Sequence, residues 1–304
     1  MLARRLLLST VCAGYFLALA VALPGGPALL AADPPAVGAG VPKGARVYSI
    51  GHSFHVFMPT ILTQIARLAG IADHHQAGIS SIGGSYVIQH WDAGGDKSKA
   101  KAAIASGKLD VLTIAPLYLP DEGIENFVRL VSEKSPRTRV LIQEFWLPYD
   151  AYVNFRKDRP QLPNRDVFEP KKLEADHDRY FGEIDELVRG LNKKYQGKPA
   201  IFVVPVGQAV LALRKAIAAG TAPGLSKQTD LFRDPIGHPR SPLEVLVAYC
   251  YFAEIYGRSP VAPIIPPALT GVGDEATTAK LNRLLEEIAW HAVTAHPLSG
   301  VKAR

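Results

Sequence analysis

The stretch VYSIGHSFH, residues 47–55 of this 304-residue chain, decides the fold. Residues 47–50 are rich in β-branched and aromatic side chains, and the run ends at Gly51. Apolar residues then recur at helical spacing over residues 56–69. This pattern predicts a strand, a sharp turn and a helix, with Ser53 just past the carboxyl end of an early strand. Open α/β sheets expose side chains to a crevice at that position, so Ser53 is a candidate nucleophile.

Four further strands are expected, most of them separated by helices: residues 75–82, 109–119, 139–145 and 200–204. The continuous apolar run over residues 109–119 suits a strand of a parallel sheet that is covered on both faces. Strands that alternate with helices predict a mostly parallel sheet with right-handed crossovers. We therefore expect an α/β fold, a three-layer α/β/α sandwich around a mostly parallel five-stranded sheet.

The first 44 residues are expected to lie outside the folded domain. Arg4 and Arg5 precede an apolar run over residues 6–23, and a Pro/Gly break and small residues around Ala32 follow, which is typical of a secretory signal peptide. We expect a signal peptide over residues 1–32, a flexible linker over residues 33–44, and export to the periplasm or the cell exterior without stable membrane insertion. The alternative is an N-terminal membrane anchor, because the apolar run approaches the roughly 20 residues that span a bilayer.

Composition limits the remaining possibilities. With 48% hydrophobic residues, residues 45–304 are expected to form a single domain with one large core. The 34 Lys and Arg residues and 28 Asp and Glu residues are interspersed without a basic stripe, which argues against nucleic acid as a partner. Cys12 lies in the expected leader, so Cys250 is the single cysteine expected in the mature chain and no intrachain disulfide can form.

Four histidines, His52, His55, His74 and His75, raise the possibility of a zinc site. Adjacent residues at the entrance of a strand point to opposite faces, however, and residues 52–55 do not form a helix-borne H-E-x-x-H motif. We therefore predict no metal and no cofactor.

Asp234 and His238 are the best candidates to activate Ser53. A serine hydroxyl is a weak nucleophile until a base takes its proton and a third group orients that base. The two residues lie four apart in the turn LFRDPIGHP, residues 231–239, which in a three-layer fold returns to the edge that carries Ser53. The alternatives are that Ser53 caps a helix and that Asp234 and His238 form a local hydrogen bond in a surface turn.

Three sequence blocks together resemble the SGNH/GDSL hydrolase superfamily: Gly51-His52-Ser53, Gly83-Gly84-Ser85 and residues 234–238. The similarity covers roughly residues 46–260. The resemblance implies a flavodoxin-like fold in which Ser53 attacks an ester carbonyl, His238 is the base and Asp234 orients it. It also implies an oxyanion hole formed by the N–H groups of Ser53 and Gly84, with Gly83 as the alternative register.

The chain departs from the family pattern in two places. The third block usually contributes an Asn, but residues 114–118 read IAPLY, so this oxyanion donor is either absent or supplied by Gln143 or Asn154. His52 stands where Asp or Asn is more common. The G-x-S-x-G elbow of ordinary α/β-hydrolases is absent, because His55 occupies the place of the second glycine.

Residues 147–172 are too polar and too many for a plain connector, which predicts an inserted lid or binding loop. The function expected from these observations is a secreted serine esterase that cleaves carboxylic esters. The substrate class preferred on the resemblance is a carbohydrate O-acyl ester, either a small molecule or a polysaccharide. The alternative is a catalytically weak or inactive carbohydrate- or envelope-binding protein on the same scaffold, because the third-block Asn is missing.

Overall fold

The computed structural model describes residues 41–94, 99–154, 157–158, 160–260, 265–269 and 271–303. The expected signal peptide and residues 33–40 of the expected linker lie outside these ranges, so export and the alternative membrane anchor stay predictions. No helix within the described ranges combines the length and the hydropathy that a membrane span requires.

Five parallel strands form the centre of the fold: β1 (Arg46–Gly51), β2 (His75–Ser81), β3 (Val111–Ile114), β4 (Arg139–Glu144) and β5 (Ile201–Pro205). Their order in the sheet is β2-β1-β3-β4-β5, and every neighbouring pair is parallel. This is the flavodoxin-like order, which opens a crevice at the carboxyl ends of β1 and β3, where the winding direction reverses. The predicted fold class is confirmed.

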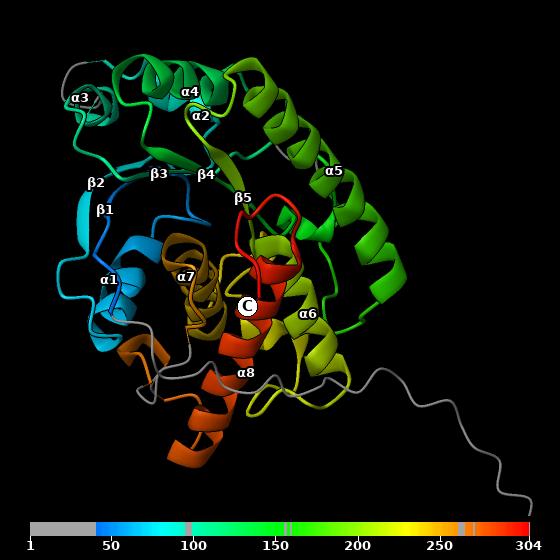
Figure 1. The fold of residues 1–304 in the computed structure, drawn as a ribbon. Coiled ribbons are helices and arrows are strands. Elements are labelled where there is room, and N and C mark those ends of the chain that lie inside the picture. The colour runs from blue at the N-terminus through cyan, green and yellow to red at the C-terminus, as the bar shows by residue number, and fades with distance from the viewer. Residues whose placement is uncertain are drawn as a thin grey trace, which may run out of the picture. The chain divides into compact units, whose positions relative to one another are not determined.

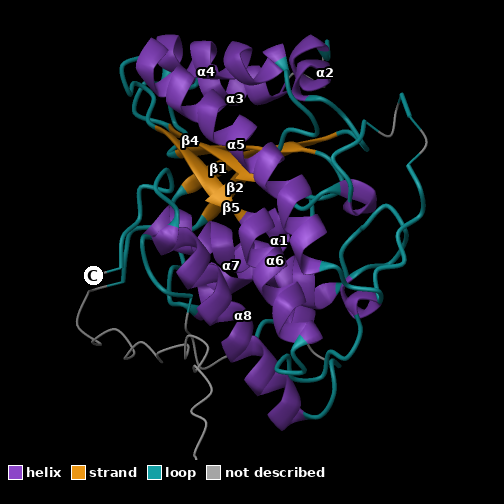
Figure 2. Ribbon diagram, turned by 90° about the vertical axis from the view of Figure 1, so that its right-hand side faces the viewer, coloured by secondary structure: helices purple, strands orange, loops and turns teal. Residues whose placement is uncertain are grey.

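Helices cover both faces of the sheet (Figures 1 and 2). One face carries α2 (Val87–Asp92), α3 (Lys99–Ala105) and α4 (Glu122–Lys134), and the other carries α1 (Met58–Leu68), α6 (Val206–Ala218), α7 (Ser241–Tyr256) and α8 (Glu275–Ala295). The long helix α5 (Pro170–Lys194) packs along β4 and β5. Short 3₁₀ turns form at Pro148–Asp150, Gln228–Leu231 and Pro267–Leu269.

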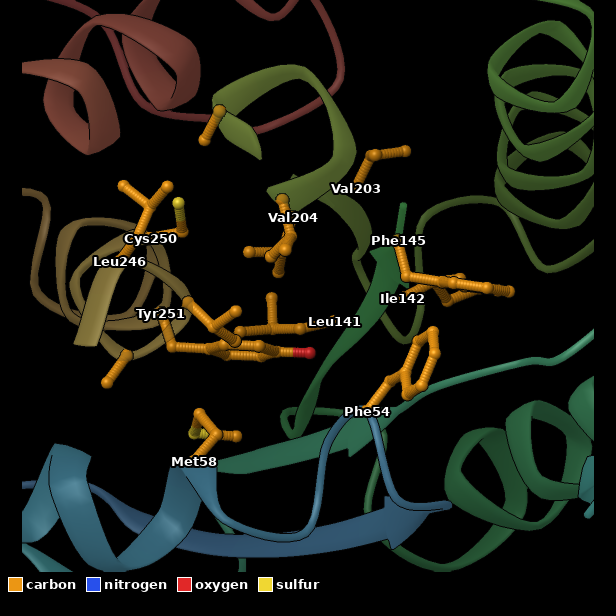
Figure 3. Packing of buried hydrophobic residues seen from close by; sticks show 14 of the residues in the cluster. Phe54, Met58, Leu141, Ile142, Phe145, Val203, Val204, Leu246, Cys250 and Tyr251 are labelled. Carbon is orange, nitrogen blue, oxygen red and sulfur yellow. The ribbon is translucent and has the colours of Figure 1, made fainter. Parts of the chain in front are cut away.

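The helix α7 lies at the centre of the core and is buried on almost every side. A helix that is apolar all round is stable only where other elements surround it. Figure 3 shows the Tyr251 ring of α7 reaching toward Leu141 of β4. Leu246 and Cys250 of α7 belong to the same buried cluster as Leu141 and as Val204 of β5. Burial raises the pKa of the Cys250 thiol, so this cysteine is a protonated packing residue.

Two elements differ from the prediction by more than one residue. The apolar run over residues 109–119 yields only the four residues of β3, because Pro116 and Pro120 lack the N–H that a ladder needs and the chain leaves the sheet after Ile114. The helix α5 begins at Pro170, inside the loop predicted over residues 147–172. Proline fits the first turn of a helix, where a backbone N–H has no intrahelical partner.

Candidate active site

Ser53 lies in a tight turn between β1 and α1. The amides of His55 and Val56 both donate to the carbonyl of His52, at 2.9 and 3.1 Å, and this closes the turn around Ser53. The turn also brings the His55 side chain against Gly51, where an added Cβ would lie 2.9 Å from it. Glycine is therefore required before the serine turn, as the predicted sharp break in the sequence indicated.

The geometry excludes the helix-cap alternative for Ser53. The first residue of α1 is Met58, and Phe57 occupies the N-cap position. Ser53 is five residues upstream of the helix, so its hydroxyl serves no cap of α1.

Ser53, His238 and Asp234 form one continuous chain of hydrogen bonds. The Oγ of Ser53 lies 2.8 Å from Nε2 of His238, a residue 185 positions away. The Nδ1 of His238 lies 2.6 Å from Oδ2 of Asp234. The other carboxylate oxygen, Oδ1, accepts the backbone amides of Gly237 and His238 at 3.0 and 3.2 Å. The structure thus brings together the three residues that the sequence singled out.

The hydrogen-bond partners at the two ends of the triad determine which imidazole nitrogen of His238 carries a hydrogen. A carboxylate can only accept, so Nδ1 of His238 carries a hydrogen toward Asp234 and leaves Nε2 free to accept the hydroxyl hydrogen of Ser53. Burial alone would raise the pKa of Asp234, but the bonds from the imidazole and from the two backbone amides outweigh it and lower the pKa below its ordinary value. Asp234 is therefore a carboxylate at neutral pH.

The chain of three residues is open to solvent on one side. The side chains of His238 and Asp234 keep 30% and 36% of their surface exposed, and Ser53 is partly exposed. A pair that served only to fix a local turn would not explain why Nε2 of His238 faces Ser53.

Aromatic rings form the wall behind His238. The ring of Phe54 meets the imidazole edge to face, with 5.4 Å between centroids and an angle of 83°. The same ring stacks on Trp146 at 4.6 Å and 9° and meets Phe145 edge-on at 6.0 Å, as Figure 3 shows for Phe54 and Phe145. Trp146 is buried, and its Nε1 donates to the carbonyl of Gly237 at 2.9 Å. The wall therefore fixes both the serine turn and the histidine loop.

A buried polar network supports the serine turn from the sheet. Nδ1 of His55 lies 2.8 Å from Oε1 of Gln143 and Nε2 lies 2.9 Å from Oγ1 of Thr113, while the hydroxyl of Tyr251 donates to Gln143 at 3.1 Å. The amide nitrogen of Gln143 donates to the carbonyl of Phe54 at 3.2 Å. Burial lowers the pKa of His55 to about 4, so the network holds a neutral imidazole at physiological pH.

This network corrects one expectation about the oxyanion hole. Gln143 is completely buried beneath the serine turn and its amide is bonded to the backbone of Phe54, so it does not replace the missing third-block Asn. The amide of Asn154 donates to the hydroxyl of Tyr86 at 2.7 Å, beside the second sequence block, and its part in an oxyanion hole stays a prediction. Residues 114–118 carry no side-chain amide, as the sequence indicated.

The second block lies beside the first at the carboxyl edge of the sheet. The amide of Ile82 donates to the carbonyl of Gly51 at 3.3 Å, which places the turn Gly83–Gly84 next to the end of β1. Gly84 has φ = 55°, the left-handed conformation that favours glycine, whereas Gly83 is not among the residues with positive φ. Of the two glycines, Gly84 is therefore the one at which the turn requires a left-handed backbone conformation.

A second Ser–His pair, which is buried, stabilises the Gly83–Gly84 turn. Ser85 Oγ lies 2.7 Å from Nε2 of His90, and both residues are buried. Burial lowers the pKa of His90 to about 4. The carboxylate of Asp121 accepts the backbone amides of Val87 and Ile88, the first two residues of α2. These contacts are structural, since neither Ser85 nor His90 reaches solvent.

The remaining histidines do not converge. His52 is buried, and its pKa is lowered to about 3 chiefly by that burial. His74 and His75 lie at the amino end of β2, the opposite edge of the parallel sheet from Ser53, and Nδ1 of His74 contacts the hydroxyl of Tyr256 at 2.6 Å. Across the described ranges, no group of three or more His, Cys, Asp or Glu residues is placed to hold a metal ion.

Sequence reasoning missed three charged residues that lie behind the Asp234–His238 loop. Arg165 and Arg214 both contact the carboxylate of Asp150, and Arg165 also contacts the loop backbone. They carry no motif spacing or periodicity. The one available signal was the predicted insertion itself, which contains Asp150 and Arg165.

Comparisons with known proteins do not identify the function, so its inference depends on the geometry of the site. No family model matches the chain, and no curated protein matches it. Among solved structures, a chain described as "a putative SGNH hydrolase from Slackia heliotrinireducens" shares 15% identity with it, covers 67% of this chain and 97% of its own, and superposes with a TM-score of 0.38. So distant a likeness carries no argument about the reaction.

Proposed function

We propose that this protein is a serine esterase of the SGNH type that hydrolyses carboxylic esters through an acyl-enzyme. The observation that carries the proposal is the unbroken chain from Ser53 Oγ through the His238 imidazole to the Asp234 carboxylate, with contacts of 2.8 and 2.6 Å. It joins a nucleophile, a base and an orienting acid in a partly exposed position, which is the constellation that activates serine in unrelated hydrolases.

Each residue has a defined step in this reaction. Ser53 Oγ forms a bond to the ester carbonyl carbon while its proton moves to Nε2 of His238, and the carbonyl oxygen becomes an oxyanion. Collapse of this intermediate breaks the bond to the alcohol oxygen, which takes the proton from Nε2. Water then attacks the acyl-enzyme in the same way and releases the carboxylic acid. Asp234 keeps its negative charge throughout and stabilises the imidazolium.

The backbone amides of Ser53 and Gly84 are the proposed donors to the oxyanion. Both follow the carboxyl ends of neighbouring strands, β1 and β2. A single oxyanion donor is worth about 10²–10³ in turnover, so the absent third-block amide predicts slow hydrolysis of unactivated esters.

Carbohydrate O-acyl esters are the proposed substrates, in the envelope or outside the cell. This part of the proposal rests on the expected leader at residues 1–32 and on the resemblance of the three sequence blocks, and the site itself selects no alcohol or acyl group. The second candidate function is a non-catalytic carbohydrate or envelope binder, which the missing donor at residues 114–118 favours.

The deciding experiment is covalent labelling combined with turnover. Purified full-length protein should hydrolyse p-nitrophenyl acetate and add one fluorophosphonate per chain, with the adduct on Ser53 by peptide mass spectrometry. Ser53→Ala should abolish both signals. Ser132→Ala, a serine at the surface of α4, should preserve both. Wild-type turnover no greater than that of Ser53→Ala, with no adduct, would support the binder instead.

A further inference from the structure

The loop that carries the acid and the base is held through its backbone carbonyls. Four consecutive carbonyl groups, residues 234–237, each accept a hydrogen bond from residues of one other segment, 146–165. The donors and distances are Arg165 Nη1 to Asp234 O at 3.0 Å, Arg165 Nη2 to Pro235 O at 3.0 Å, Tyr149 N to Ile236 O at 3.0 Å, and Trp146 Nε1 to Gly237 O at 2.9 Å.

Arg165 supplies two of these four bonds. The residue is only 4% exposed, so its charge is withdrawn from water and must be met by the protein. Its planar guanidinium presents several N–H groups in a fixed fork, and here two of its nitrogens meet adjacent carbonyls, Asp234 O and Pro235 O. A flexible ammonium could not hold both carbonyls in one plane.

Asp150 aligns the guanidinium from the other side. Its Oδ1 accepts the Nε of Arg165 at 3.2 Å, and both of its oxygens accept Arg214 of α6 at 2.9 Å. Burial would raise the pKa of Asp150, but Arg214 and Arg165 outweigh it and lower the pKa, so the carboxylate is charged. The loop is thereby tied to the helix α6 through two arginines and one carboxylate.

The backbone at Asp150 is shaped for this contact. Tyr149 and Asp150 have φ = 57° and 55°, a left-handed conformation that non-glycine residues adopt at a cost. That conformation directs the Tyr149 amide to Ile236 O and the Asp150 carboxylate to both arginines. Strain of this kind persists where surrounding contacts enforce it, and it commonly accompanies a functional site.

We propose that Arg165 is a positioning residue for the catalytic triad: its forked guanidinium, oriented by Asp150, fixes the loop that places His238 against Ser53. This inference rests on the proposed function and extends it. Arg165 contacts loop carbonyls and Asp150, so its loss should displace Nε2 of His238 and leave the ester-binding surface in place.

The expected kinetic consequence is a loss in kcat with little change in KM. A displacement of about 1 Å in reacting groups can cost about 10²-fold in rate, so Arg165→Met should lower kcat about 10- to 100-fold. KM should stay within about twofold of the wild-type value, because the contacts that bind the substrate equally in the ground state and the transition state are unaffected.

Arg139 provides a matched control. It is a partly buried arginine that likewise donates to two consecutive backbone carbonyls, those of Glu254 and Ile255, at 3.4 and 2.8 Å. It lies at the amino end of β4, the opposite edge of the sheet from Ser53. Arg139→Met therefore removes a comparable structural contact without touching the loop.

The experiment compares kcat and KM for p-nitrophenyl acetate in full-length wild type, Arg165→Met and Arg139→Met, with the unfolding midpoint of each. We expect a selective loss of kcat in Arg165→Met and a shifted proton resonance for the His238–Asp234 hydrogen bond. Guanidinium ion at low concentration should restore part of the turnover of Arg165→Ala, whereas sodium chloride at equal ionic strength should not. The hollow beside Pro163 and Arg165 leaves room for its entry.

The outcomes separate this inference from the proposed function. If the wild type neither turns over ester nor labels at Ser53, the esterase itself is refuted. If the wild type is active and Arg165→Met matches Arg139→Met in kcat, the esterase stands and the positioning role is refuted. Should Arg165→Met fail to fold, Arg165→Lys decides, because it keeps the charge beside Asp150 and loses the fork; a wild-type kcat in that variant would also refute the role.

Discussion

Replacing Asp234 by asparagine tests whether the carboxylate oxygen that faces Nδ1 of His238 is needed for catalysis. The amide is nearly the same size as the carboxylate, and its oxygen can still accept the backbone amides of Gly237 and His238, which lie 3.0 and 3.2 Å from Oδ1. The group facing Nδ1 of His238 then becomes an NH₂, which donates where the carboxylate oxygen accepted at 2.6 Å.

The change reverses the proton positions on the imidazole. Nδ1 of His238 must now accept, so the hydrogen moves to Nε2, the atom 2.8 Å from Ser53 Oγ. An Nε2 that carries a hydrogen cannot take the serine proton. A wrong tautomer of this kind lowers kcat by about 10⁴-fold, which corresponds to about 5 kcal/mol of transition-state stabilisation.

The measurement is steady-state hydrolysis of p-nitrophenyl acetate by wild type, Asp234→Asn and a control, Asp274→Asn. Asp274 caps α8 by accepting the Thr277 amide, so the control loses an aspartate charge that takes no part in the Ser53–His238–Asp234 chain. Asp234 is more than a third exposed, and removal of its charge should change the free energy of unfolding by no more than about 1 kcal/mol.

Two results would refute the reasoning. Turnover of Asp234→Asn within about tenfold of wild type would mean that the carboxylate does not set the tautomer. A full additional loss when Asp234→Asn is combined with Ser53→Ala would mean that the two residues act independently, since members of one catalytic unit are strongly non-additive.

Two further predictions concern the oxyanion turn and the buried acid at the end of β4. Gly84→Ala should lower kcat by about 10²-fold or more, because a side chain at φ = 55° strains the turn and displaces the proposed donor. The control is Gly83→Ala, whose added Cβ meets no atom within 4 Å and which should keep near wild-type turnover. Equal rates for the two variants would contradict the assignment of Gly84 as the oxyanion donor. Burial raises the pKa of the Glu144 carboxyl from 4.5 to about 8 in the folded protein. The folded state therefore favours the protonated carboxyl, and the stability that this group contributes is fully present below pH 4.5 and is lost as pH rises through 8. Urea titrations at pH 5 and pH 8 should therefore show wild type losing about 3 kcal/mol more than Glu144→Gln over that interval, and parallel losses in the two proteins would exclude the effect.

The sequence predicted the part of the site that a parallel sheet organises. The carboxyl ends of adjacent parallel strands meet at one edge, so a serine after the first strand and a glycine turn after the second were bound to be neighbours once the strands were recognised. The Asp234–His238 loop was placed at the same edge by topology and by its resemblance to a sequence block. Its contact with Ser53, 185 residues away, agrees with that placement.

The errors arose where position along a strand decides which way a side chain points. Gln143 and Glu144 are consecutive on β4, and a shift of one residue exchanges the two faces of a strand. Sequence alone could not tell that Gln143 lies under the serine turn. Arg165 was missed for a different reason: its partners lie about 70 positions later in the chain, and backbone carbonyls leave no trace in the sequence.

The proposed catalytic geometry joins two units that are anchored independently. Ser53 is held from the sheet by Gln143, which bonds the carbonyl of Phe54, whereas the loop with Asp234 and His238 is held by the segment 146–165. Besides the hydrogen bond between Ser53 and His238, the units meet at the ring of Phe54. This ring contacts the His238 imidazole edge to face and stacks on Trp146, whose indole donates to Gly237. Stacked rings of this kind add about 0.5–1.5 kcal/mol beyond their buried area. Through its contacts with both His238 and Trp146, the Phe54 ring therefore helps to set the spacing between nucleophile and base.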